Sequence, residues 1–186
     1  MAKTPEPPFT IVFAQEPFEI RDYGPMLVAE TRVPGERDAA VNAGFRILAS
    51  YIFGANKPGA KIAMAAPVTQ DKGVSIAMTA PVTQEGDDSG WRVRFIMPQD
   101  YTRANLPAPT DARIAIMEVP ARRKAAIRFS GLRTNANLAA RQAELAEFIA
   151  SRKLKPVGAP IYAYYDPPWT LPFLRRNEIL WQVAPA

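Results

Sequence analysis

The two longest stretches without proline carry the hydrophobic spacing of helices. Residues 35–57 and 121–155 contain no proline, although the chain has 19 prolines. Apolar side chains in each stretch recur every three or four positions, which places them on one face of a helix. The positions that share a face are Val41, Phe45, Leu48 and Ile52 in the first stretch and Leu138, Leu145, Phe148 and Ile149 in the second. The pattern therefore predicts two amphipathic helices.

Short runs of β-forming residues flank both predicted helices. The clearest lies between 91 and 97, where Trp91, Val93, Phe95 and Met97 fall at alternate positions and Arg92 and Arg94 would point away, a pattern typical of a half-buried strand. The other predicted strands are 9–13, 18–21 and 26–32 before the first helix, 113–119 and 124–129 before the second, and 161–165 and 178–183 after it.

The same order of elements occurs twice. One constant offset places Ile20 beside Met117, Val28 beside Ala125 and Tyr51 beside Phe148. Each half, about residues 9–97 and 111–183, would then be β-β-α-β-β, and neither half could close a core alone. The sequence predicts a single α+β domain over residues 1–186, with one curved antiparallel sheet, two helices against it, and a ligand groove between a helix and the sheet.

One phrase is written twice, as IAMAAPVTQ at 62–70 and IAMTAPVTQ at 76–84. Each copy would form a strand that ends where Pro67 or Pro81 lacks the amide donor, and the residues between the copies favour a hairpin turn. Met64 and Met78 would either fill the core or line a cleft for a flat apolar ligand. The pattern leaves both interpretations open.

Length and charge narrow the class of protein. With 186 residues, of which 48% are hydrophobic, the chain can bury one substantial core. No run is long enough to span a bilayer, and the first residues lack an apolar signal core, so we expect a cytoplasmic protein, or a periplasmic one if a signal peptide has been removed. The net charge of +5 is scattered, which does not indicate a nucleic-acid partner.

The chain contains neither histidine nor cysteine. Disulfides, thiol nucleophiles, serine-histidine triads and zinc sites with thiolate or imidazole ligands are therefore excluded. Acid-base chemistry would fall to Asp, Glu, Tyr or Lys, and no pair of carboxylates stands out by its spacing. The sequence predicts no catalytic residue and no metal site.

Three motifs together resemble the SOUL haem-binding protein family. They are FEIRDYGP at 18–25, KIAMAAPV at 61–68, and YDPP at 165–168 followed by RRNE at 175–178. The resemblance runs from about residue 8 to residue 183. It implies a distorted β-barrel with two helices, and non-covalent binding of haem or another porphyrin. The architecture is also similar to the ligand-binding domains of gyrase-inhibitor-like bacterial regulators.

A porphyrin needs an apolar slot, cations for its propionates and, where iron is held axially, a donor atom. Arg46 and Arg175 suit carboxylates, although Arg46 is equally an ordinary surface charge and Arg175 equally a tie between the last strand and a loop. Trp169 could belong to a lid or cap the core. The predicted contacts are Asn42, Arg46, Ala49, Ser50 and Phe53 on the first helix, Met64 and Met78, and Trp169, Leu171, Phe173 and Arg175 near the end.

The chain departs from the family at the positions that concern iron. Asp22 stands where some relatives carry a proposed haem-ligating histidine, and proposed basic positions fall here on Asn42, Ser50 and residues 170–171. Any axial ligand would have to be Met64, Met78 or a tyrosine, and Tyr23 and Tyr51 are better interpreted as packed aromatics. The resemblance implies a tetrapyrrole carrier or buffer without histidine ligation. The alternatives are a hydrolase or lyase acting on a hydrophobic small molecule, and a protein-interaction module.

Overall fold

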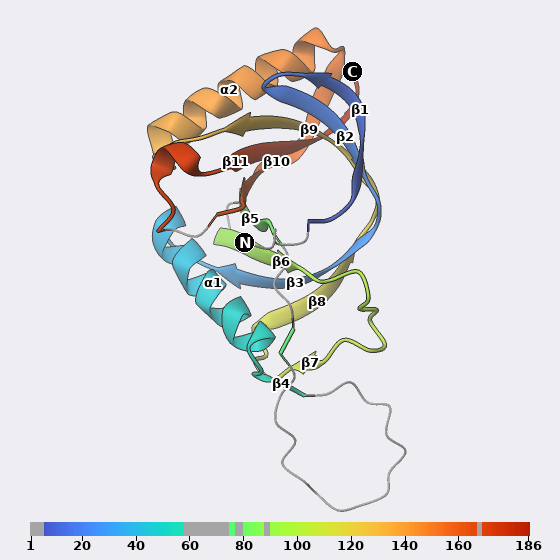
Figure 1. Ribbon diagram of the computed structural model, residues 1–186, viewed down its shortest axis with the longest axis vertical. Helices are drawn as coiled ribbons and strands as arrows, with labels where there is room; N and C mark the ends of the chain where they lie inside the picture. Colours follow the sequence, from blue (N-terminus) through green and yellow to red (C-terminus); the bar gives the residue numbers. More distant parts are fainter. Residues whose placement is uncertain (1–5, 58–74, 77–79, 88–89, 167–168) are drawn as a thin grey trace, which may run out of the picture. The chain divides into compact units, whose positions relative to one another are not determined.

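The computed structural model shown in Figure 1 describes residues 6–57, 75–76, 80–87, 90–166 and 169–186. Its elements fall into two compact units that interleave along the chain. Unit 1 comprises Met1–Pro7, Met26–Ala80 and Ser89–Val119, and unit 2 comprises Pro8–Pro25, Pro81–Asp88 and Pro120–Ala186.

Unit 1 consists of helix α1 against three antiparallel strands. The strands are hydrogen-bonded in the order β6-β3-β8, and β4 pairs with β7 as a separate short ribbon. Helix α1 packs on β3 and β6 (Figure 1). The bounds are β3 (Met26–Val33), α1 (Arg37–Ile52), β4 (Asn56–Lys57), β6 (Gly90–Ile96), β7 (Ala108–Pro109) and β8 (Ile114–Val119).

Unit 2 consists of helix α2 against a larger antiparallel sheet. Its strands follow the order β1-β2-β9-β11-β10-β5, and α2 lies along β9, β10 and β11 (Figure 1). The bounds are β1 (Phe9–Gln15), β2 (Phe18–Tyr23), β5 (Val82–Asp87), β9 (Arg122–Phe129), α2 (Asn135–Ser151), β10 (Leu154–Tyr164), the 3-10 helix η1 (Pro172–Leu174) and β11 (Asn177–Pro185).

The stripe predicted for α2 is confirmed. Thr134 caps the helix, because its Oγ1 accepts a hydrogen bond from the backbone N–H of Asn137 at 3.2 Å. All four predicted positions of the stripe are buried. They form one core with Ile20, Ala125, Ile127, Phe129, Ile179 and Val183 from the sheet. Burial of this apolar surface is what holds α2 on unit 2.

The stripe predicted for α1 is confirmed only in part. Leu48 and Ile52 are buried, but Phe45 is exposed and Val41 is half-buried. The helix instead turns its small residues Ala40 and Gly44 to the strands. Periodicity selects large apolar side chains, and here two small ones mark the contact face.

Strands from the two halves of the sequence pair with each other. Strand β2 pairs with β9, with Ile20 opposite Ala125, while β3 pairs with β8, with Val28 opposite Met117. Four of the six residues aligned by the sequence offset thus face each other across two equivalent strand pairs. The α+β class, with antiparallel strands and two helices, is confirmed. The single domain over residues 1–186 and barrel closure stay predictions.

The repeated phrase is described only in part. The first copy with Met64, the predicted turn, and Met78 in the second copy lie outside the described residues. In the second copy the predicted strand falls mostly outside the described residues, and β5 begins at Val82, directly after Pro81. A residue without an amide donor fits just before a strand as well as at its end. None of the described helices is long and apolar enough to cross a membrane.

Gly44 allows α1 to approach the sheet closely. A Cβ atom at this position would lie 2.6 Å from Cγ2 and 3.0 Å from Cβ of Val93, which is fully buried. A branched side chain has little freedom to move aside in a packed core.

Gly44→Ala is therefore expected to destabilise the protein by about 1–3 kcal/mol, measured by urea denaturation. In an open helical position the same change would stabilise by up to about 1 kcal/mol. Adding Val93→Ala should make the Gly44→Ala change nearly neutral relative to Val93→Ala alone. If Gly44→Ala is as stable as the original chain, this close contact does not exist.

Candidate functional site

The sheet of unit 2 has a charged group at the centre of the face turned away from α2. Side chains alternate between the two faces of a strand, so Ile179 enters the α2 core while its neighbour Glu178 points to the other face. Glu178 is fully buried. A buried carboxylate is costly unless hydrogen bonds and opposite charge compensate for the lost water.

Two arginines and a tyrosine provide that compensation. Arg21 of β2 donates from Nη1 and Nη2 to Glu178 Oε2 and Oε1 at 2.7 and 3.1 Å. Arg176 donates from Nε and Nη2 to Oε1 at 3.0 and 2.8 Å, and the hydroxyl of Tyr165 donates to Oε2 at 2.7 Å. Arg21 also donates from Nε to Glu19 Oε2 at 2.6 Å. These five residues form what we call the Glu178 cluster.

The electrostatics of the cluster favour its charged form. Burial alone would raise the pKa of Glu178, but the hydrogen bonds and charge of Arg21, with Arg176 and Tyr165, outweigh it and hold this pKa below its usual value. Burial would lower the pKa of Arg21, yet Glu178 raises it well above the ordinary range. The cluster is therefore a fixed ion pair rather than a proton donor at neutral pH.

Three tyrosines of the chain are held as neutral phenols. Burial, together with the charge of Glu178, raises the pKa of Tyr165 far above its usual value. Burial also raises the pKa of Tyr23, and it raises that of Tyr51 in unit 1 to about 12. The Tyr51 hydroxyl donates to the Pro107 carbonyl at 2.6 Å. None of the three readily supplies the phenolate that would ligate iron.

Asp22 lies outside the Glu178 cluster. Its carboxylate accepts two hydrogen bonds from Arg123, from Nε and Nη2, both at 2.7 Å, in a partly exposed ion pair. These bonds lower the pKa of Asp22. Asp22, which stands where the resemblance placed a histidine of some relatives, is thus part of a partly exposed ion pair with Arg123. Among the described residues, no group of three or more acidic side chains is placed to hold a metal ion.

The predicted contacts on the first helix share its outer face. Asn42, Arg46 and Ser50 are exposed and Ala49 is half-buried. Phe53 directly follows the helix with 71% of its surface accessible. Unit 1 therefore presents one aromatic ring and one arginine together on the exposed side of α1. Their part in ligand binding stays a prediction.

The predicted contacts near the end of the chain also face solvent. Trp169 is 82% exposed and Phe173 68% exposed, and Leu171 is exposed as well. The interpretation of Trp169 as a cap on the core is therefore wrong. Arg175 donates from Nε to the Thr170 carbonyl at 2.7 Å, which agrees with its interpretation as a tie. Met64 and Met78 lie outside the described residues.

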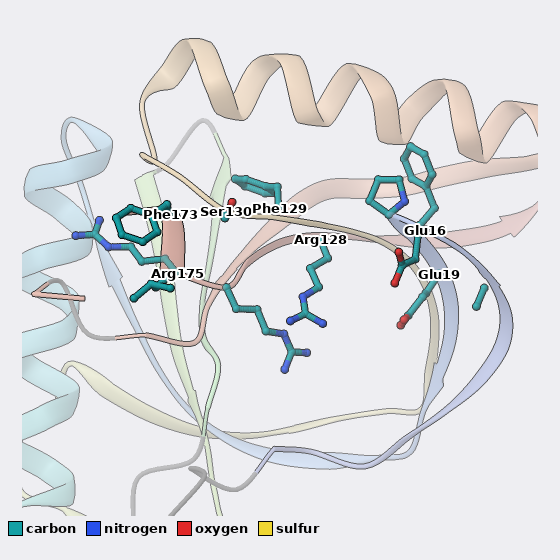
Figure 2. Close-up of a pocket in the computed structure, with 12 residues that line it drawn as sticks. Glu16, Glu19, Arg128, Phe129, Ser130, Phe173 and Arg175 are labelled. Atoms are coloured by element: carbon teal, nitrogen blue, oxygen red, sulfur yellow. The ribbon is translucent and has the colours of Figure 1, made fainter. Parts of the chain in front are cut away.

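Unit 2 contains a pocket of about 660 Å³ beside the Glu178 cluster. It lies between the β1–β2 turn, the end of β9 and the segment from Phe173 to Arg176 (Figure 2). Phe173 and Arg175 were predicted as contacts, whereas Arg128 and Glu16 were not. The spacing of residues could not have indicated them, because three distant stretches of the chain form this pocket.

The arrangement is an α+β fold whose unit 2 contains a buried group of mutually paired charges. The model of the SOUL heme-binding protein family matches residues 4–182. The chain therefore belongs to the SOUL heme-binding protein family, which confirms the resemblance found in the sequence.

Individual proteins are similar to this chain in part of the sequence or in fold. "Heme-binding protein 2" from Homo sapiens is 47% identical over 53 residues, a match that spans 28% of this chain and 26% of that protein. The EcmrR C-terminal domain has a TM-score of 0.65 at 13% identity, covering 91% of this chain and 98% of that one. A hydrolase from Listeria innocua has a TM-score of 0.55 at 11% identity, covering 91% and 93%. These two structures show similarity of fold alone.

Glu178→Gln is expected to lower the free energy of unfolding by about 3–5 kcal/mol at pH 7, because Arg21 and Arg176 lose the buried carboxylate that they share and Arg21 keeps only the partly exposed Glu19. The folded-state pKa of Glu178 lies below its unfolded value. The carboxylate thus contributes its full stability above about pH 4.3, and this contribution is lost as the pH falls through the lower, folded-state pKa. Urea denaturation across pH should show the two proteins converging below about pH 4.

Glu144→Gln is the matched control. It breaks the surface ion pair with Arg141, at 2.9 Å, and should cost less than about 0.5 kcal/mol. The double variant Arg21→Met with Glu178→Leu should be more stable than Glu178→Gln, since neither charge remains buried alone. Equal stability of Glu178→Gln and Glu144→Gln would contradict the buried ion pair.

Proposed function

We propose that this chain binds haem or another tetrapyrrole non-covalently, as a carrier or buffer and without histidine ligation. The observation that carries the proposal is the family match over residues 4–182. The chain has no histidine, so the macrocycle is held chiefly by contact with apolar side chains. The bound porphyrin is cargo in this proposal, and a cytoplasmic location is part of it.

Exposed aromatic side chains support the apolar part of the proposal. Phe53 in unit 1 and Trp169, Leu171 and Phe173 in unit 2 leave large apolar surfaces in water, which in a soluble protein often mark a binding surface. A planar ligand that buries about 400 Å² of apolar area gains on the order of 10 kcal/mol before the costs of association. That gross gain is a source of affinity that requires no metal-ligand bond.

Cationic side chains support the polar part. Arg46 lies on the same exposed face of α1 as the predicted contacts, and it has no side-chain partner among the described residues. A guanidinium can form two parallel hydrogen bonds with one carboxylate. We propose that Arg46 pairs with a propionate group of the bound ligand.

Three of the described tyrosines do not suit the role of an axial iron ligand. Tyr23, Tyr51 and Tyr165 are buried or partly buried phenols with raised pKa values. Met64 and Met78 lie outside the described residues and remain the proposed donors if any donor is used. In this proposal, an axial bond to the haem iron therefore contributes little to the affinity.

The criterion for a hydrolase or lyase is not met among the described residues. Such an enzyme would need an unpaired carboxylate with a raised pKa in the groove. The buried carboxylate of unit 2, Glu178, is instead paired and has a lowered pKa. The similarity to a Listeria innocua hydrolase concerns the fold and carries no chemistry.

Titration with hemin and with iron-free protoporphyrin, followed through the Soret band, should give saturable binding of both. The two affinities are expected to agree within about tenfold, because iron contributes no strong bond to a histidine or thiolate. Met64→Leu and Met78→Leu should leave the hemin spectrum unchanged unless sulfur contacts iron. Absence of saturation with either porphyrin would refute the proposal.

Phe53→Ala is expected to weaken protoporphyrin binding by about tenfold or more, because a buried phenyl group contributes about 1.5–3 kcal/mol. Phe53→Leu should retain most of the affinity. Ile11→Ala, an exposed apolar residue on β1, serves as the matched control and should bind like the original chain. If Phe53→Ala and Ile11→Ala behave alike, the α1 face is not part of the site.

A further inference from the structure

The pocket of unit 2 has a rigid frame. The backbone N–H of Arg128 donates to the Pro17 carbonyl at 3.0 Å, which holds the β1–β2 turn against β9. The N–H of Gly131 donates to the Pro172 carbonyl at 2.9 Å and holds the η1 segment against the end of the same strand. Phe18 stacks on Phe148 of α2 with ring centroids 4.6 Å apart. Three parts of the wall are thus fixed to one strand and one helix.

The charges in this pocket differ in how they are compensated. Arg176 and Glu19 belong to the Glu178 cluster, where each already has an opposite charge. The Arg128 side chain, in contrast, has no partner among the described residues and is exposed. Figure 2 shows its guanidinium extending into the middle of the pocket, with Glu16 at the far end. Arg128 is therefore a cation available to an incoming group.

The pocket also has exposed apolar surface, on the side where Arg175 lies. Phe173 and Leu174 line it and remain 68% and 64% exposed, and Figure 2 places Phe173 on the side opposite Glu16. The volume of about 660 Å³ lies in the range that encloses most of a small organic molecule. One available guanidinium beside exposed apolar side chains suits a ligand with an anionic end and an apolar body.

We propose that this pocket binds a small amphiphilic anion, with its carboxylate or sulfonate on Arg128 and its apolar body against Phe173 and Leu174. The proposed site lies entirely in unit 2 and includes no residue of α1. It goes beyond the tetrapyrrole proposal, since it requires neither a porphyrin nor iron. Glu16 determines the orientation of the ligand, because its carboxylate repels an anionic group at the end of the pocket farthest from Phe173.

Two fluorescent probes test this proposal. They are 8-anilinonaphthalene-1-sulfonate and N-phenyl-1-naphthylamine, which share the same aromatic body but differ in the anionic group. The original chain should bind the sulfonate saturably. Arg128→Gln should weaken sulfonate binding by about tenfold or more, the usual effect of losing a charge-assisted hydrogen bond, and should leave binding of the neutral probe within about twofold. Phe173→Ala should weaken both probes.

Arg122→Gln is the matched control, because Arg122 is an exposed arginine on the same strand that does not line the pocket. It should bind both probes like the original chain, and Glu16→Gln should bind the sulfonate at least as tightly. The proposal is overturned if the sulfonate does not bind, or if Arg128→Gln and Arg122→Gln bind it equally. It is also overturned if Arg128→Gln loses both probes to the same extent. None of these measurements uses a porphyrin, so the two proposals can fail separately.

Discussion

The fold of unit 2 depends on neutralising one buried carboxylate. Glu178 lies at the start of β11 with no exposed surface, and its strongest partner, Arg21, comes from β2 at the opposite end of the chain. The bond joins two strands that both flank β9. A sheet with another strand order would leave a charge buried without a partner, which costs several kcal/mol. The ion pair thus favours the strand order in which β2 and β11 both pair with β9, and it stabilises that order.

This constraint explains what the family motifs contain. Arg21 and Tyr23 come from the first motif, Tyr165 from the YDPP motif, and Arg176 and Glu178 from the RRNE motif. Together they form or adjoin the Glu178 cluster. In this chain those side chains are hydrogen-bonded to one another. The motifs therefore identified the family and the fold correctly while they gave little information about the position of the ligand.

Sequence patterns predicted the elements well where large apolar side chains make the contact. The α2 stripe was found completely, because Leu138, Leu145, Phe148 and Ile149 are both large and buried. The α1 stripe was found only in part, because Gly44 makes the closest approach to the sheet and a residue without a side chain gives no hydrophobic signal. The same limitation applies to charge. Arg21 and Arg123 are both arginines in strands, yet one is buried and the other exposed, and only the fold distinguishes them.

The candidate ligand surfaces were harder to predict, for a physical reason. A side chain that is exposed and makes no contact within the protein follows neither hydrophobic periodicity nor charge pairing. Sequence patterns therefore do not indicate its position. Phe53 and Phe173 were proposed through the family resemblance, and the structure shows that both are exposed. Arg128 has the same chemistry as its neighbour Arg176, but Arg176 is held by Glu178 and Arg128 is not. In unit 2 the buried carboxylate therefore holds Arg21 and Arg176 in the sheet, whereas Arg128, which lines the pocket, has no side-chain partner among the described residues.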